Sequence, residues 1–189
     1  MSNQLKSFFV AATRQNDGKT MTSLGLFNAI CKRFKSVAYM KPVGQQYLVV
    51  DDKKVDKDAV LFQQVYDLKD DFSYMSPIAV PKGFTQGYID QPDNEKARKV
   101  LQDSHAKLVK DKDFLVVEGT GHAGVGSVFD LSNAAVAKLL RLKVILVSLG
   151  GIGRSIDELM LNKADDLSER KSSYISQGIN FSRSRWYGE

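Results

Sequence analysis

The chain has 189 residues, of which 43% are hydrophobic and 26% charged, with a formal net charge of +5. This length fits one domain with a full hydrophobic core, and the composition is ordinary for a soluble globular protein. The mild positive charge does not imply nucleic acid, a single cysteine excludes an intrachain disulfide framework, and no apolar run approaches the roughly 20 residues that span a bilayer, so we expect a cytoplasmic protein without a membrane partner.

The first predicted elements are a strand, a polar loop and a helix. Residues 7–12 form a continuously apolar run, typical of a strand buried on both faces of a parallel sheet. Apolar residues recur at helical spacing over 19–34, where Cys31 is expected to be a small core residue. A second strand is expected at 36–40, and residues 45–57 show no clear period beyond a brief YLVV.

The middle of the chain is predicted to contain two helices. The first covers residues 58–68, with Leu61 and Val65 among its inward-facing side chains. A short strand at 76–81 and a charged helix over 94–110 follow. Strands and helices therefore alternate through this part of the chain.

Two strands in the C-terminal half lead into glycine-rich loops. FLVVE at 114–118 precedes GTGHAGVGS, and KVILVSL at 143–149 precedes GGIG. A helix capped by Ser132 or Asn133 is expected before the second strand, and one capped by Ser155 after it. This alternation predicts an α/β fold with a largely parallel sheet. Its glycine-bearing loops should gather at the carboxyl edge of the sheet, where such folds bind ligands.

The stretch FFVAATRQNDGKTMTSLGL, residues 8–26, has the outline of a phosphate-binding loop. Gly18 permits close approach of the backbone, Lys19 would reach the terminal phosphates, and the Thr20 hydroxyl would face Mg²⁺. The helix N-terminus and the loop N–H groups complete such a site. The alternative is a capped turn with an exposed lysine. The first glycine of the common G-x-x-x-x-G-K-[ST] pattern is absent, because Thr13 occupies its position.

A family resemblance accounts for the missing glycine. ATRQNDGKT (12–20) resembles the longer G-T-x-x-x-x-G-K-T loop of the dethiobiotin synthetase family, with Ala12 in the first glycine position. Further segments resemble the family in the same order: YMKPVG (39–44), DKDAVLFQ (56–63), VVEGTGHAGVGS (116–127) and ILVSLGGIG (145–153). SPIAVPKGFTQGYID (76–90) looks closer to the N-terminal nucleotide-binding domain of long phosphate acetyltransferases and to cobyrinic acid a,c-diamide synthase-like proteins. The resemblance implies a P-loop NTPase three-layer sandwich with a mostly parallel sheet.

The resemblance also implies an ATP and Mg²⁺ site. Thr20, Asp58 and Glu118 would hold the metal, which prefers hard oxygen ligands, and Lys41 would hold substrate oxygens in the transition state. The plain alternatives are a salt-bridged strand-end acid for Glu118, a helix-start residue for Asp58 and a surface lysine for Lys41. The residues implied for nucleotide binding are Thr13, Asn16, Asp17, Gly18, Lys19, Thr20, Met21 and Gly119.

Two basic residues near the predicted site have open roles. Arg14 precedes Lys19 by five residues, the spacing at which septum-site and plasmid-partition ATPases carry a second lysine that reaches the nucleotide of a dimer partner. Because arginine can grip phosphate bidentately, Arg14 is a candidate catalytic residue alongside Lys19 and Lys41, acting in cis or in trans; a solvent-exposed arginine is the alternative. His122 stands where the family has a glycine, and it is either a substrate contact or a solvated loop residue.

We expect one P-loop nucleotide-binding domain over residues 1–165 and an atypical tail over 166–189. The tail is rich in serine and arginine and shows neither a strand nor a capped, periodic helix. Disorder, a frame change, truncation and a divergent natural end are all compatible with this composition. Full-length relatives continue into another strand and a base-recognition loop, so the sheet is expected to be incomplete at the C-terminal end, with an uncovered edge.

Two functions follow from this resemblance. In the first, an ATP-dependent enzyme phosphorylates a carboxylate or carbamate, and an amine then attacks the acyl phosphate. In the second, the chain is a nucleotide-sensing regulatory domain with little or no catalysis, like the N-terminal domain of long phosphate acetyltransferases. A partition-type ATPase on DNA is supported only by the basic tail. The expected partners are a small-molecule substrate and a second copy of the chain in a homodimer.

Overall fold

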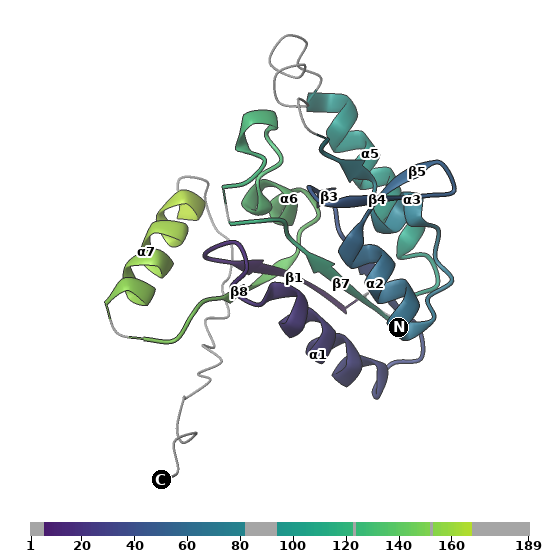
Figure 1. The fold of residues 1–189 in the computed structure, drawn as a ribbon, viewed down its shortest axis with the longest axis horizontal. Coiled ribbons are helices and arrows are strands. Elements are labelled where there is room, and N and C mark those ends of the chain that lie inside the picture. The colour runs from purple at the N-terminus through teal and green to yellow at the C-terminus, as the bar shows by residue number, and fades with distance from the viewer. Residues whose placement is uncertain (1–5, 82–93, 123, 152, 168–189) are drawn as a thin grey trace.

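The computed structural model describes residues 6–81, 94–122, 124–151 and 153–167, built around a four-stranded sheet (Figure 1). The strand order is β2-β7-β1-β8, and every neighbouring pair is parallel. Most residues of these strands are apolar because helices cover both faces of the sheet. The four strands predicted from apolar runs are confirmed: β1 (Lys6–Ala12), β2 (Val37–Met40), β7 (Phe114–Glu118) and β8 (Lys143–Val147).

Helices form a layer on each face of the sheet, which confirms the α/β sandwich (Figure 1). On one face α1 (Lys19–Cys31) packs against β1 and β7, and α2 (Lys57–Tyr66) lies beside it. On the other face lies α6 (Asn133–Leu139). Two further helices pack against each other near the β2 edge, α3 (Phe72–Met75) and α5 (Asn94–Leu108).

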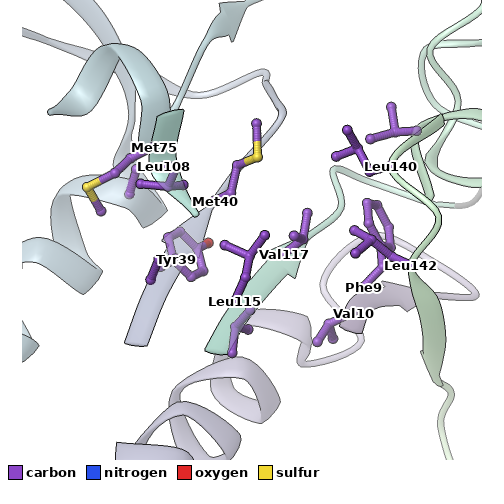
Figure 2. Packing of buried hydrophobic residues seen from close by; sticks show 14 of the residues in the cluster. Phe9, Val10, Tyr39, Met40, Met75, Leu108, Leu115, Val117, Leu140 and Leu142 are labelled. Atoms are coloured by element: carbon purple, nitrogen blue, oxygen red, sulfur yellow. The ribbon is translucent and has the colours of Figure 1, made fainter. Parts of the chain in front are cut away.

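The core is continuous through the sheet (Figure 2). Phe9 of β1 extends toward Leu140 and Leu142 at the end of α6. On the opposite face, the Tyr39 ring stacks on Phe62 of α2, with 3.7 Å between ring centroids. Successive strand residues point to opposite faces, so each buried strand contributes side chains to both layers. This packing places the carboxyl ends of β1, β2 and β7 side by side.

Short strands surround the carboxyl edge of the main sheet. β3 (Val43–Gly44) pairs with β6 (Ile78–Ala79), so the strand expected at 76–81 is present but shorter. β4 (Tyr47–Val50) and β5 (Lys53–Asp56) form an antiparallel hairpin. The sequence pattern did not predict this hairpin. Its turn residues Asp51 and Asp52 have φ values of 48° and 61°, which is the left-handed conformation of a tight hairpin turn. An Asn-Gly pair is a clearer sequence signal for such a turn than Asp-Asp.

The expectation that Cys31 belongs to the core was wrong, because its side chain is exposed. The buried face of α1 passes through Ser23 and Phe27 and continues with the partly buried Ile30 and Phe34. Cys31 lies one turn after the buried Phe27 and on the same side of α1, but it is the last residue of the helix, and its side chain is exposed there.

Two details of the other helices also differ from expectation. In α2 the buried residues are Ala59 and Phe62, whereas Leu61 and Val65 are 36% and 56% exposed. Those two side chains are four residues apart, so they share the solvent face of the helix. The last helix, α7, spans Arg154–Leu167, and Ser155 lies within its first turn and not at the cap.

Some predictions concern residues outside the described part of the chain. These residues are 82–93, which include much of the acetyltransferase-like segment, and 168–189, which make up most of the predicted tail. Among the described residues, no helix combines the length and the apolar character that a membrane span requires.

Candidate functional site

The loop between β1 and α1 forms one wall of a cavity of about 270 Å³ at the carboxyl edge of the sheet. Gly18 precedes the first helical residue with φ of 91°, and Asn16 has φ of 68°. These left-handed conformations turn the chain sharply into α1. As a result, the N-terminus of a long helix opens toward the cavity, which suits an anion.

Lys19 enters the cavity and is only 7% exposed, so it is not the exposed lysine of the alternative interpretation. Its Nζ atom donates to the carbonyl oxygen of Gly121, 2.5 Å away, in the loop after β7. Burial, followed by the charge of Lys41, lowers the pKa of Lys19, and the charge of Glu118 opposes this shift. The positive charge of Lys19 is therefore only partly balanced by the nearby acids, which suits the binding of an anion.

Glu118, the last residue of β7, is fully buried and accepts three hydrogen bonds. Thr20 Oγ1 donates to Glu118 Oε1 over 2.9 Å, and Lys41 Nζ donates to the same oxygen over 2.9 Å. The Tyr39 hydroxyl donates to Oε2 over 3.2 Å. Burial, and then the Glu118 charge, raises the pKa of Tyr39 well above its usual value, which keeps the phenol neutral and a donor.

Lys41 links Glu118 to α2. Its Nζ atom also lies 2.7 Å from Asp58 Oδ2, and its side chain is 5% exposed. Burial by itself would lower the pKa of Lys41, but the charges of Glu118 and Asp58 outweigh burial and raise it. Lys41 is therefore a charged residue of the cavity wall and not a surface lysine. Glu118 forms a salt bridge at the end of β7, and Asp58 lies in the first turn of α2, so both plain alternatives for these acids stay open beside the metal-ligand interpretation.

Oxygen atoms of Thr20, Asp58 and Glu118 converge on this point, and the donor set fits Mg²⁺. The Lys41 ammonium already bridges both carboxylates, so a cation is accommodated there. Among the described residues there is no cluster of three or more His, Cys, Asp or Glu side chains that could hold a metal. Mg²⁺ does not require one, because it commonly takes one or two carboxylates and retains water or phosphate oxygens.

Asp56 is a cavity residue that sequence reasoning missed. It caps α2 by accepting from the Asp58 N–H over 2.9 Å, and it lines the same cavity. Burial raises the pKa of its carboxyl to about 6, against the opposing charge of Lys41. The available signal was a polar residue two positions before Asp58 at a helix start. It was obscured by the many acids between residues 51 and 58.

Asn133 fixes the loop that follows β7. Its Oδ1 accepts from the Thr120 N–H over 3.0 Å, and its Nδ2 donates to the carbonyl oxygens of Thr120 and His122 over 2.9 and 2.8 Å. Ser132 is the actual cap of α6, which leaves the Asn133 amide free for the loop. A Cβ at Gly119 would lie 2.5 Å from Asn133 Oδ1, so this close approach requires glycine.

Replacing Asn133 with alanine is expected to lower the free energy of unfolding by about 1–3 kcal/mol, because buried peptide groups of Thr120 lose their partners. It should also weaken ATP binding, since the loop that carries the Gly121 carbonyl beside Lys19 loses its anchor. Ser132→Ala is the matched control and should cost about 1 kcal/mol through the lost helix cap, with unchanged ATP affinity. Urea unfolding and calorimetry measure the two effects. Equal ATP affinity in both variants would contradict this role of Asn133.

The remaining predicted residues lie toward the margin of the site. Arg14 Nε is 3.3 Å from a carboxylate oxygen of Glu158 in α7 and 3.5 Å from one of Asp17, and Arg14 is not among the residues lining the cavity. Thr13 Oγ1 donates to Asp17 over 3.1 Å. Met21 lies at the rim and is 74% exposed. The structure thus gathers the predicted lysines and metal ligands, and it directs Thr13, Arg14 and Asp17 toward one another.

His122 lies at the surface of the loop. Its side chain is exposed, and its Nδ1 accepts from the Gly124 N–H over 3.2 Å. This local hydrogen bond favours the interpretation of His122 as a solvated loop residue over that of a substrate contact.

The position of this site defines the class of protein. A buried strand that leads through Gly-Lys-Thr into a helix, at the carboxyl edge of a parallel sheet, is the arrangement of a P-loop NTPase. The kinase domain of Escherichia coli tyrosine kinase ETK shares the fold with a TM-score of 0.53 and 14% identity, over 94% of this chain and 74% of that domain. The chimerical protein CapA2B2 also has a TM-score of 0.53, at 8% identity, over 87% of this chain and 71% of its own. At these identities the likeness concerns the fold alone.

Sequence comparison gives the family. A family model described as AAA domain matches residues 6–172, and the chain belongs to this family as a dethiobiotin synthetase-like P-loop NTPase. ATP-dependent dethiobiotin synthetase BioD 2 of Salmonella typhimurium is 33% identical over 117 residues, which cover 62% of this chain and 49% of that protein. BioD of Clostridium kluyveri is 24% identical over 156 residues, 78% and 64% of the two chains. The predicted resemblance is confirmed, although the chain spans only about half the length of BioD 2 that it matches.

Proposed function

We propose that this chain binds Mg-ATP and transfers the γ-phosphoryl group to a carboxylate or carbamate of a small-molecule substrate. One observation carries the proposal: two buried lysines, Lys19 and Lys41, enter the same cavity beside Thr20, Asp58 and Glu118. Phosphoryl transfer depends mainly on positioning and on neutralisation of oxygen charge. A cavity that concentrates cations and metal-binding oxygens at a helix N-terminus provides both.

Each residue has a distinct part in the proposed reaction. Lys19 and the N–H groups at the start of α1 bind the terminal phosphates, and Thr20, Asp58 and Glu118 would hold Mg²⁺, which when bound neutralises phosphate charge. Lys41 orients the substrate oxygen. That oxygen forms a bond to the γ-phosphorus while the bond to the bridging oxygen of ADP breaks. An amine of the substrate then attacks the acyl carbon and releases phosphate.

The test is ADP release with Mg-ATP, diaminopelargonic acid and bicarbonate. With ¹⁸O-labelled bicarbonate, transfer through an acyl phosphate moves one labelled oxygen into the released phosphate. We expect substrate-dependent ADP release and labelled phosphate. ADP release that does not depend on substrate, or phosphate without label, would contradict carbamate activation by this chain.

A nucleotide-sensing regulatory domain is the second candidate. It is favoured by Arg14, which is held by Asp17 and Glu158 outside the cavity, and by Ala12 in the first glycine position of the loop. This function predicts Mg-ATP binding by calorimetry together with no ADP release for any carboxylate or amine substrate. The two measurements therefore separate the candidates.

Arg14 is proposed to act on the phosphates of a dimer partner. Arg14→Ala should then lower ATP turnover several-fold at unchanged nucleotide affinity, and turnover per chain in the unaltered protein should rise with protein concentration. Arg154→Ala is the matched control, because Arg154 also pairs with Glu158, over 2.8 Å, but lies in α7 and is exposed. Equal turnover in both variants would contradict a role of Arg14 in the reaction.

A further inference from the structure

We propose that the Lys41 ammonium is a resident cation of the metal site, which keeps divalent metal out until nucleotide arrives. The inference rests on the proposed Mg-ATP function. Lys41 Nζ lies 2.7 Å from Asp58 Oδ2 and 2.9 Å from Glu118 Oε1. Thr20 Oγ1 donates to that same Glu118 oxygen over 2.9 Å. The ammonium therefore pairs with the two carboxylates that would hold the metal.

Burial makes a cation necessary beside these two carboxylates. Glu118 is 0% exposed, and the Asp58 side chain is 15% exposed. A buried carboxylate that loses its cationic partner is strongly destabilising. Lys41 forms ion pairs with both acids, whereas Lys19 Nζ is directed to the Gly121 carbonyl. Lys41 is thus the group that compensates the two negative charges when no metal is bound.

The same contacts place Lys41 in competition with a divalent cation. A divalent cation would be held by the same two carboxylates, Asp58 and Glu118, that pair with Lys41. Lys41 is tethered just after β2, so its effective concentration at the site is high. Nucleotide phosphates add ligands for the metal and attract the ammonium. Metal loading and release of Lys41 are then one coupled event. The flexible lysine stem becomes available to substrate oxygens only after the nucleotide and metal are in place.

Mn²⁺ binding to the nucleotide-free protein tests this coupling, with free Mn²⁺ measured by electron paramagnetic resonance. Lys41→Met should bind Mn²⁺ roughly tenfold or more tightly than the unaltered protein, because removal of a close positive charge favours a divalent ion. Lys41→Arg keeps a cation and should retain weak binding. Lys69→Met removes the same charge at a side chain that is 79% exposed and pairs with Asp67, and it should leave Mn²⁺ affinity unchanged.

Thermal unfolding provides a second measurement, because Lys41→Met leaves two carboxylates without compensation. Its melting temperature should fall, and Mn²⁺ should restore it by more than Mn²⁺ raises that of the unaltered protein. The double variant Lys41→Met, Glu118→Gln should lose the gain in Mn²⁺ affinity. Mn²⁺ affinity of Lys41→Met within twofold of the unaltered protein, or a melting temperature of this variant that Mn²⁺ does not raise, would overturn the proposal.

These outcomes are independent of the proposed reaction. If the unaltered protein releases no ADP but Lys41→Met gains Mn²⁺ affinity, the competition between Lys41 and metal is supported and the enzyme function is contradicted. If the unaltered protein turns over substrate but Lys41→Met gains no Mn²⁺ affinity, the enzyme function is supported and the competition is contradicted.

Discussion

Lys19→Met is expected to reduce substrate-dependent ADP release by about 10²- to 10³-fold, the usual effect of removing one donor from a site that stabilises transition-state charge. Lys19 is buried in the cavity wall and directed at the Gly121 carbonyl. Its ammonium is therefore positioned before any ligand binds. Methionine preserves the length and packing of the side chain but removes the charge.

The same variant should distinguish phosphate binding from general damage to the site. Calorimetry with ATP and with AMP should show a large loss of affinity for ATP and little change for AMP, because Lys19 is assigned to the terminal phosphates. Stability should hardly fall, since burial already disfavours the charged form of Lys19. Lys32→Met, at the exposed C-terminal end of the same helix, is the control. Equal losses for ATP and AMP would place Lys19 elsewhere in the site.

The parts of this fold that the sequence predicted are those determined by local patterns. The apolar residues at 144–147 are typical of a strand in a parallel sheet, and they are confirmed as part of β8, which pairs with β1 and is partly buried. Gly18-Lys19-Thr20 at a strand-to-helix junction predicted the loop and the start of α1. Errors arose where exposure depends on a neighbour that the pattern does not contain, as for Cys31 at the end of α1 and for Val65 on the solvent face of α2.

The electrostatic arrangement of the site could not be predicted in the same way. Lys41, Asp58 and Glu118 were each selected through the family resemblance, but their mutual ion pairs join β2, α2 and β7. Such pairs depend on the packing of the helix layer against the sheet. Asn133 shows the same limitation: a helix-start pattern predicts a cap, and only the folded chain reveals that its amide holds the loop after β7.

Glu118→Gln is expected to have the second large effect, on both stability and metal-dependent activity. Glu118 is fully buried and accepts from Thr20, Tyr39 and Lys41. Glutamine keeps the shape but presents an amide donor toward one of these donors and removes the charge paired with Lys41. Breaking one side of a buried ion pair costs about 3–5 kcal/mol. Here Asp58 still compensates Lys41, so we expect a loss near 3 kcal/mol, measured by urea unfolding.

The control for Glu118→Gln is Asp70→Asn, which breaks an ion pair with Lys112 over 2.7 Å at a partly buried position outside the cavity. Asp70→Asn should cost less than Glu118→Gln, about 1 kcal/mol, because both side chains of this pair keep some contact with solvent, and it should leave the Mg²⁺ dependence of ADP release unchanged. Glu118→Gln should instead raise the Mg²⁺ concentration needed for half-maximal release by at least tenfold, because it removes one of two carboxylate ligands. A Glu118→Gln protein that is destabilised but keeps the Mg²⁺ requirement of the unaltered chain would assign Glu118 to the support of Lys41 and Tyr39, and leave Asp58 as the acid that holds the metal.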